Sequence, residues 1–315
     1  MSRSSESEPR HHPLVAVVGP TGAGKSALAL RLARERPGEI VSCDSLQVYR
    51  GLDIGSAKAT PEERAAVPHH LLDVVEPGED FSAAEYSRLA RQAVRDVAAR
   101  GRLPIVAGGT GLYLEALLGG LFPGPSRDEP LRRRLEAMAE RFGDARLHRL
   151  LARVDPAAAA RIPPGDRVRV VRALEVFRTT GRPLSDLHRE GREPLGGFDV
   201  LVLVLDPDRP ALRRAVERRT REMFERGLVE EVRRLLEGGL SPRLRPLQAI
   251  GYRQAVAVAL GRMGRGEAER ETVTRTMQLA KRQRTWFRHH RGGTWCPDGE
   301  TALAAALGWL DRTRT

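Results

Sequence analysis

One eight-residue run, residues 19–26, constrains the possible fold of this chain more than any other stretch. It matches G-x-x-x-x-G-K-[ST], follows the apolar segment 14–18, and precedes segment 27–34, which is built from strong helix formers. A strand, a glycine-rich loop and a helix in this order surround phosphate oxygens with backbone N–H groups and with the positive end of the helix dipole. The alternative, a glycine-rich turn with an incidental lysine, does not explain these flanks. The residues of this predicted phosphate loop are Gly19, Pro20, Thr21, Gly22, Ala23, Gly24, Lys25 and Ser26.

Two side chains of the phosphate loop add chemistry to its backbone. Lys25 supplies a full positive charge, and the Ser26 hydroxyl is placed to contact a Mg²⁺ ion that shares the phosphates, with Asp44 as a second candidate ligand. The loop therefore predicts binding of a diphosphate or a triphosphate. Whether that ligand is a nucleotide depends on the rest of the chain.

The charge balance points to a polyanionic partner. The 315 residues include 53 Lys and Arg against 41 Asp and Glu, a net charge of +12, and a field of that sign attracts nucleic acid. A GC-rich genome would explain arginine in place of lysine, but not this excess over acidic residues. The two cysteines, Cys43 and Cys296, form no CxxC pair, which fits a reducing compartment. No apolar run approaches the ~20 residues of a membrane span, so we expect a cytoplasmic protein with no membrane contact.

Two further predicted strands end in polar residues. Asp44 and Ser45 follow segment 39–42, and the run Gly108-Gly109-Thr110-Gly111 follows segment 104–107. Ligands of open α/β sheets bind at the carboxyl ends of the strands, so we expect both groups in the crevice of the phosphate loop. Asp44 would contact a magnesium ion or act as a general base, and the alternative is a turn-forming Asp-Ser pair. Thr110 would offer a hydroxyl and an amide to a phosphate oxygen.

The order of elements predicts an α/β fold with a P-loop NTPase-like parallel sheet, a helical insert and a helical C-terminal part. Residues 1–13 read as a disordered lead-in without the apolar core of a signal peptide. Residues 14–118 and 198–315 form the predicted catalytic core, and residues 119–197 form an arginine-rich insert in which no strand is evident. The expected helices of the insert and the C-terminal part span 130–142, 144–153, 166–180, 209–226, 228–237, 246–260 and 266–290.

Other polar residues have competing interpretations. Asp206 follows the apolar strand 200–205 and could imitate the acidic strand end of a nucleotide hydrolase, but Asp208-Arg209-Pro210 is also a helix cap. His69 and His70 are adjacent, so their side chains point to opposite faces of an extended segment, and a structural role is favoured over metal binding.

The last long predicted helix carries a basic stripe. Lys281, Arg284, Arg288 and Arg291 recur at helical spacing, with Trp286 and Phe287 beside them. Such a surface suits an RNA backbone and an unstacked base. Alternatively, the stripe is a solvated face and the aromatic rings belong to the core.

Taken together, several blocks resemble one known family. The phosphate loop and the run from Cys43 to Lys58 resemble the opening of the bacterial tRNA dimethylallyltransferases. Further blocks follow in the family's order and in register, over roughly residues 14 to 295. They are Pro68-His69-His70-Leu71-Leu72-Asp73, Gly108-Gly109-Thr110-Gly111-Leu112-Tyr113, Arg172-Ala173-Leu174-Glu175-Val176, Ile250-Gly251-Tyr252-Arg253 and Leu279-Ala280-Lys281-Arg282-Gln283.

The resemblance implies a group transfer. In this family the loop holds the diphosphate of dimethylallyl diphosphate with Mg²⁺, and the dimethylallyl group passes to N6 of adenosine 37 in tRNAs that read codons beginning with U. The implied partner is the anticodon stem-loop with A36-A37-A38, whose adenine is flipped out into the crevice. The implied catalytic residues are Asp44 as the proton acceptor, Thr110 and Arg219, the last two beside the diphosphate.

The resemblance also implies contacts to tRNA. Two departures from the family pattern stand out: Ala215 occupies a position that is often arginine, and Cys43 one that is usually small or apolar. With only two cysteines in the sequence, we expect no counterpart of the zinc-finger extension of eukaryotic relatives. The implied tRNA contacts are Asp44, Ser45, Leu46, Gln47, Thr110, Arg132, Val168, Arg169, Val170, Val171, Arg172, Gln248, Ala249, Ile250, Gly251, Tyr252 and Arg253.

Two other functions use the same loop. One is a P-loop kinase, or an isopentenyltransferase, acting on free adenine nucleotides; neither needs the charge of +12 or the basic C-terminal helix. The other is an RNA-binding protein with ATP as its switch, which requires a clear acidic strand end. Nothing in the sequence requires more than a monomer.

Overall fold

The computed structural model describes residues 11–122, 124–125, 127–289 and 293–313. These residues form two compact units. The α/β unit comprises Met1–Leu118 and Leu195–Thr315, and the helical unit comprises Gly119–Pro194. None of the described helices combines the length and the apolarity that crossing a bilayer requires.

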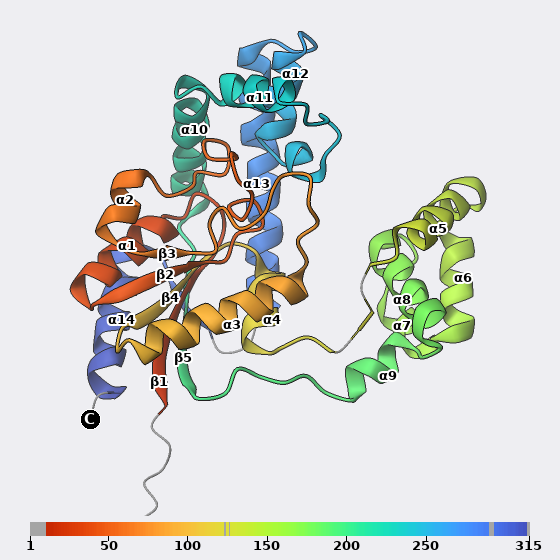
Figure 1. Cartoon of the computed structure of the whole chain (residues 1–315), viewed down its shortest axis with the longest axis horizontal. Coiled ribbons are helices and arrows are strands. Elements are labelled where there is room, and N and C mark those ends of the chain that lie inside the picture. Colours follow the sequence, from red (N-terminus) through yellow and green to blue (C-terminus); the bar gives the residue numbers. More distant parts are fainter. Residues whose placement is uncertain (1–10, 123, 126, 290–292, 314–315) are drawn as a thin grey trace, which may run out of the picture. The chain divides into compact units, whose positions relative to one another are not determined.

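A parallel sheet forms the centre of the α/β unit, with the order β3-β2-β4-β1-β5-β6 among the described residues (Figure 1). Every neighbouring pair is parallel, which confirms the predicted α/β fold. The first helix follows β1 through the phosphate loop. The strands are β1 (His12–Val18), β2 (Gly38–Ser42), β3 (His69–His70), β4 (Leu103–Gly108), β5 (Phe198–Leu205) and β6 (Gly293–Cys296).

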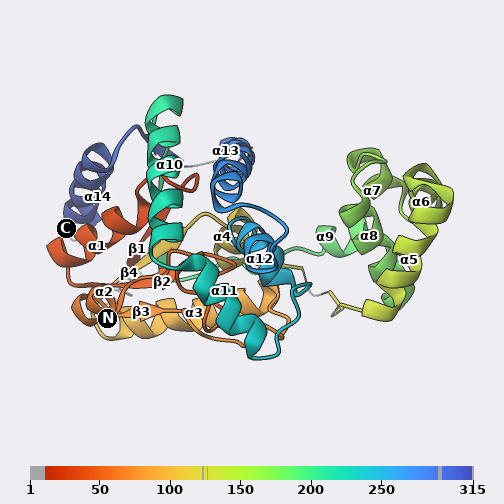
Figure 2. The same cartoon turned by 90° about the horizontal axis from the view of Figure 1, so that it is seen from above.

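Both faces of the sheet are buried, which explains why its central strands are continuously apolar. In β1, Leu14, Ala16 and Val18 pack on one face, and Val15 and Val17 pack on the other. Figure 2 shows α1 and α14 together on the side of the strands away from α3. The helices of this unit are α1 (Lys25–Glu35), α2 (Pro61–Ala66), α3 (Ala83–Ala99), α4 (Gly111–Leu118), α10 (Arg209–Glu225), α11 (Leu228–Glu237), α12 (Tyr252–Ala259), α13 (Arg265–His289) and α14 (Gly299–Thr313).

The C-terminal part differs from its prediction in three places, one of which is helix α14, which was not predicted. The expected helix 246–260 is a 3₁₀ turn, η1 (Arg245–Gln248), followed by α12, because Gly251 between them has φ +91°. That positive φ suits glycine and interrupts helical hydrogen bonding. The chain after α13 also contains strand β6 at the sheet edge. This strand has only four residues, which is too short for a clear pattern of alternating polar and apolar residues.

The predicted lead-in and insert both extend too far. Strand β1 begins at His12, inside the predicted lead-in 1–13, because β5 begins at Phe198 and pairs with it from the first residue. Leu195 belongs to the α/β unit rather than to the insert 119–197: its N–H donates to Leu118 O at 2.9 Å and its side chain joins the core.

The helical unit has its own core. Leu147, Leu151, Val171 and Leu174 lie at its centre. Two of its helices, α7 and α9, were not predicted, and each spans only six residues. The helices of this unit are α5 (Glu129–Phe142), α6 (Asp144–Val154), α7 (Pro156–Arg161), α8 (Arg167–Thr180) and α9 (Leu184–Arg189).

Candidate functional site

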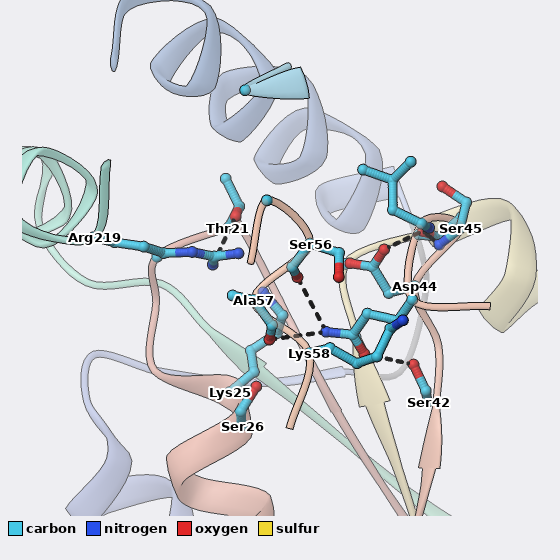
Figure 3. Close-up of a pocket in the computed structure, with 18 of the residues that line it drawn as sticks. Thr21, Lys25, Ser26, Ser42, Asp44, Ser45, Ser56, Ala57, Lys58 and Arg219 are labelled. Carbon is cyan, nitrogen blue, oxygen red and sulfur yellow. Dashed lines mark hydrogen bonds between the residues drawn. The ribbon is translucent and has the colours of Figure 1, made fainter. Parts of the chain in front are cut away.

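A cavity of about 1070 Å³ lies at the carboxyl ends of the central strands in the α/β unit. The phosphate loop, Asp44, Thr110, Arg219 and residues 248–251 all contribute to its lining. Figure 3 shows Lys25, Asp44 and Arg219 among these lining residues. The sequence predicted that the first three would share a crevice, and the structure brings them together. Helix α13 supplies a further wall through Gln283 and Trp286.

The phosphate loop is shaped by backbone geometry that suits glycine. Gly19 has φ +134°, and a Cβ at this position would collide with Leu205 O. Gly24, at φ +87°, is the N-cap of α1, and no described side chain caps that helix. The first amides of α1 and the positive end of its dipole are therefore available to an anion.

Lys25 and Arg219 place two positive charges in the cavity without an ion-pair partner among the described residues. Lys25 Nζ donates to Pro20 O at 2.8 Å, and Arg219 Nη1 donates to Thr21 Oγ1 at 3.3 Å. Burial, and then the nearby Arg219 charge, lower the pKa of Lys25 to about 8. Burial also lowers the pKa of Arg219. A bound anion would relieve both effects, because an opposite charge favours the protonated forms.

Asp44 and Thr110 belong to one hydrogen-bonded arrangement. Asp44 Oδ1 accepts from Leu46 N–H at 2.8 Å, so the turn that we considered as an alternative does form. Ser45 N–H donates to Thr110 Oγ1 at 3.1 Å, and Thr110 N–H donates to Cys43 O at 3.2 Å. The turn engages Oδ1 and leaves the carboxylate facing the cavity, where its charge raises the pKa of both Lys25 and Arg219. Turn formation and a chemical role are compatible.

The oxygen donors needed for Mg²⁺ are present in the cavity. Ser26 is exposed in the first turn of α1, and both its hydroxyl-bearing side chain and the Asp44 carboxylate line the cavity beside the phosphate loop. Magnesium is usually held by one or two protein oxygens together with phosphate oxygens and water. This donor set fits that pattern.

Buried ionic contacts hold the segment 44–58 in place. Lys58, with 1% of its side chain exposed, donates to Tyr49 O at 2.8 Å and forms ion pairs with Asp53 and Asp73 at 2.6 and 2.7 Å. The Gln47 amide donates to Ser56 O and Ala57 O, both at 3.3 Å. Gln47, an implied tRNA contact, therefore has an internal role in this segment.

Glu231 ties the same segment to α12. Its carboxylate is buried and accepts from the N–H groups of Asp53 and Ile54 and from Tyr252 OH, the last at 2.7 Å. Tyr252, an implied tRNA contact, is therefore a core residue. Sequence reasoning missed both Lys58 and Glu231 as organising residues, since their partners lie on separate segments and no local pattern marks them.

The other implied tRNA contacts divide into exposed and buried side chains. In α8, Val168 is 71% exposed and Arg169 is exposed, whereas Val170 and Val171 are each 1% exposed and pack in the core of the helical unit. Arg132 and Arg172 both donate to Glu175, at 3.1 and 2.8 Å. Near the cavity, Gln248 and Arg253 are exposed, and Ala249, Ile250 and Gly251 line the wall.

The competing interpretations of Asp206 and Asp208 are resolved by their contacts. Asp206 Oδ1 accepts from Arg284 Nε in an ion pair, and Asp208 caps α10 by accepting from Ala211 N–H at 2.6 Å. Asp206 is thus engaged by a fixed cation at the strand end. The same ion pair removes Arg284 from the predicted basic stripe.

The rest of the stripe is partly surface and partly core. Lys281 and Arg288 are exposed, and Arg291 lies outside the described residues. Phe287 is 1% exposed, and Trp286 contacts it edge-to-face with ring centroids 5.1 Å apart. Phe287 therefore belongs to the core, as the alternative held, whereas Trp286 is half-buried and lines the cavity.

His69 and His70 make separate structural contacts. His69 Nδ1 lies 2.7 Å from Val67 O, and His70 Nε2 lies 2.7 Å from a carboxylate oxygen of Glu39. Glu39 also forms ion pairs with Arg100 and Arg102, and the Arg100 and His70 hydrogen bonds lower its pKa against the effect of burial. This cluster fastens β3 to the sheet.

The fold defines a P-loop α/β protein in which residues of the loop, Asp44, Thr110 and Arg219 line one cavity. The model of the IPP transferase family matches residues 47–290. The chain therefore belongs to the IPP transferase family, as the sequence blocks predicted.

Relatives with curated names agree along most of the chain. The tRNA dimethylallyltransferase of Koribacter versatilis is 49% identical over 287 residues, which cover 90% of this chain and 92% of that protein. That of Anaeromyxobacter dehalogenans is 52% identical over 284 residues, with coverage of 90% and 94%.

Solved structures agree as well. The tRNA isopentenylpyrophosphate transferase of Bacillus halodurans is 37% identical, with a TM-score of 0.69 and 96% of each chain covered. A eukaryotic dimethylallyltransferase described as acting on tRNA is 30% identical, with a TM-score of 0.73 and coverage of 88% of this chain and 70% of that one.

Proposed function

We propose that the chain transfers a dimethylallyl group from dimethylallyl diphosphate to N6 of adenosine 37 in tRNAs that read codons beginning with U. The N6–C1 bond forms while the C1–O bond to the diphosphate breaks, and the leaving oxygen keeps the electron pair. The single observation that carries the proposal is the pair Lys25 and Arg219, two cations in the cavity without a carboxylate ion pair among the described residues. A leaving diphosphate supplies the charge that this pair lacks.

The diphosphate would lie between the phosphate loop and Arg219. Backbone amides at the start of α1 and the Lys25 ammonium would bind its oxygens, and Arg219 would approach from α10 beside Thr21. Thr110 would add a hydroxyl from the opposite wall. The Ser26 hydroxyl, with Asp44 as a second candidate, would hold Mg²⁺, which when bound supplies further positive charge to the leaving group.

Asp44 would act on the acceptor side. An adenine amine is a weak nucleophile, and a positioned carboxylate that accepts its proton is the role expected of a general base. The Leu46 N–H bond fixes the orientation of the carboxylate at 2.8 Å from that amide nitrogen. Reaching the cavity would require the adenine to leave its base stack, as enzymes acting on bases in RNA or DNA commonly require.

For tRNA recognition we propose the exposed members of the implied set. Val168 and Arg169 on α8, together with Gln248 and Arg253 beside the cavity, offer accessible apolar, cationic and amide groups. Ser45 and Leu46 would contact the nucleotide that enters the cavity, and A36-A37-A38 of the anticodon loop would be the recognised sequence. The excess positive charge supports binding to the RNA backbone. We further propose that the protein acts as a monomer on cytoplasmic tRNA.

The test mixes purified protein, Mg²⁺, labelled dimethylallyl diphosphate and an unmodified tRNA with A36-A37-A38, followed by nuclease digestion to nucleosides. Prenylated adenosine from this tRNA, and none from a matched transcript with guanosine at position 37, is the expected result. Label on AMP in a parallel reaction would instead assign the protein to the free-nucleotide isopentenyltransferases. ATP turnover without prenyl transfer would make the phosphate loop a nucleotide site and reject the proposal.

A further inference from the structure

The side chain of Gln283 joins two loops of the cavity. From helix α13, Gln283 Oε1 accepts from Thr21 N–H at 2.9 Å, and Gln283 Nε2 donates to Gly109 O, also at 2.9 Å. The partners lie 262 and 174 residues away in sequence. One partner only donates and the other only accepts, so the orientation of the amide is defined by chemistry.

Each bonded loop carries a different part of the proposed reaction. Thr21 belongs to the phosphate loop, and its hydroxyl accepts from Arg219 at 3.3 Å. Gly109 precedes Thr110, whose hydroxyl accepts from Ser45 N–H directly after Asp44. Through these contacts, Gln283 connects the diphosphate side of the cavity to the proton-acceptor side.

Helix α13 is anchored in the core on the face that carries the Gln283 side chain. Ala280 and Phe287, at i−3 and i+4 from Gln283, are 2% and 1% exposed and anchor this face of the helix in the core. The contact with the Gly109 loop is equally close: a Cβ on Gly109 would lie 2.5 Å from Gln283 Nε2, and one on Gly111 would collide with the Trp286 ring. Gln283 therefore extends from a rigid element onto two glycine loops.

We propose that Gln283 is a positioning residue that sets the separation between the phosphate loop and the Thr110 loop. This inference rests on the proposed function: by holding the two loops apart, Gln283 would set the distance between the C1–O bond of the donor and the Asp44 segment. Loss of the bridge would leave Thr21 N–H and Gly109 O without that partner and free the two loops to shift independently. A misplacement of about 1 Å can reduce an enzymatic rate about 10²-fold.

The principal test compares Gln283→Met with the matched control Gln278→Met, since Gln278 is exposed on the same helix. We expect Gln283→Met to lower single-turnover prenyl transfer at saturating substrates by about 10- to 100-fold. Its Kd for tRNA should stay within about twofold of wild type, because the amide acts within the protein. Gln278→Met should leave both quantities unchanged. A weaker tRNA affinity with an unchanged saturated rate would make Gln283 a direct RNA contact and overturn the proposal. An unchanged rate with a lower melting temperature would make it purely structural.

A second measurement does not depend on activity. Hydrogen exchange should accelerate in Gln283→Met at both residues 19–26 and residues 43–47, and in Gln283→Glu mainly at residues 43–47. The glutamate keeps an acceptor for Thr21 N–H but has no donor for Gly109 O. Unchanged exchange in either segment of Gln283→Met would reject the bridge. If wild type fails to prenylate tRNA but the two variants show this exchange pattern, the proposed function is rejected and the bridge is retained.

Discussion

Two pairs of basic side chains in this molecule have opposite electrostatic surroundings. In the helical unit, Arg132 and Arg172 both donate to Glu175, which is fully buried and also accepts from Asp128 N–H at 2.7 Å. In the α/β unit, Lys25 and Arg219 bond to a carbonyl and a hydroxyl oxygen and have no carboxylate ion pair among the described residues. The first pair is compensated by direct ion pairs within the protein. The second is not, although the Asp44 charge in the same cavity raises the pKa of both of its members.

We interpret the difference as one between a structural cluster and the proposed diphosphate site. Burying a cation without an opposite charge is costly, so it persists where a ligand supplies the charge. The lowered pKa values of Lys25 and Arg219 report that cost. The resemblance assigned Arg132 and Arg172 to tRNA binding, yet Glu175 already engages both guanidinium groups. Arginine content alone therefore does not identify the cations proposed to bind a ligand.

Removal of an uncompensated cation should produce the largest functional effect. We expect Lys25→Met to lower kcat/KM for dimethylallyl diphosphate by about 10³-fold, the scale of removing a charge-stabilising group from an active site. The melting temperature at pH 7 should not fall, because the variant also removes a positive charge that burial disfavours. Steady-state kinetics and calorimetry measure the two quantities. A large loss of stability with little change in kcat/KM would place Lys25 in the same class as the compensated pair.

Removal of the compensating carboxylate should act on stability. Glu175→Gln leaves two guanidinium groups beside a neutral amide, and breaking a buried ion pair typically costs about 3 kcal/mol. Urea unfolding, with hydrogen exchange followed in α5 and α8, measures the change. As a control, changing Glu175, Arg132 and Arg172 together to methionine should recover most of the loss, since the buried charges then disappear together. Equal stability of wild type and Glu175→Gln would remove the distinction between the two pairs.

The carboxylate that faces the uncompensated pair should matter for turnover rather than for binding. Asp44→Ala should reduce the single-turnover rate by about 10²-fold while tRNA affinity stays unchanged, as expected for a general base. Asp44→Asn separates the two roles of this residue, because an amide oxygen still accepts from Leu46 N–H but cannot take a proton at neutral pH. If Asp44→Asn were as active as wild type, the turn alone would account for the residue.

Local sequence patterns predicted the strand–loop–helix junctions, because each is encoded by consecutive residues. The phosphate loop, Asp44 and the Thr110 loop each follow a strand of the parallel sheet, and they share one cavity as predicted. The predicted family and fold class are also confirmed. Their chemical roles stay predictions. The polar bridges were not predictable in this way: Glu231 reaches Ile54 across 177 residues, and Gln283 reaches Thr21 across 262.

Periodicity could have improved one part of the site prediction. Val170, Val171 and Leu174 follow the i, i+1, i+4 spacing of a buried helix face, and Val168 lies off that face. The resemblance carried a continuous run of α8 over as RNA contacts without this distinction. When a continuous motif lies on a helix, the residues of its buried face should therefore be separated from the exposed ones before the motif is assigned to ligand contacts.

The smallest expected effect is a dependence on pH that has opposite signs for binding and for stability. With the pKa of Lys25 at about 8, its protonated fraction falls above that pH, so the affinity for dimethylallyl diphosphate should weaken about tenfold between pH 7 and pH 9. Over the range from about pH 8 to its ordinary value of 10.5, the unfolded chain holds more protons at this residue than the folded one. The Lys25 contribution to the free energy of unfolding therefore rises with pH over that range.

Titration calorimetry at pH 7, 8 and 9 measures the affinity, and Lys25→Arg is the matched control because its guanidinium stays protonated throughout. We expect the affinity of Lys25→Arg to change little with pH. Proton uptake on binding above pH 8, detected with buffers of different ionisation enthalpy, should be present in wild type and absent in Lys25→Arg. The same pH dependence in both proteins would assign the titration to another group. Lys25 would then resemble Arg132 and Arg172, whose charges are balanced by Glu175 without a ligand.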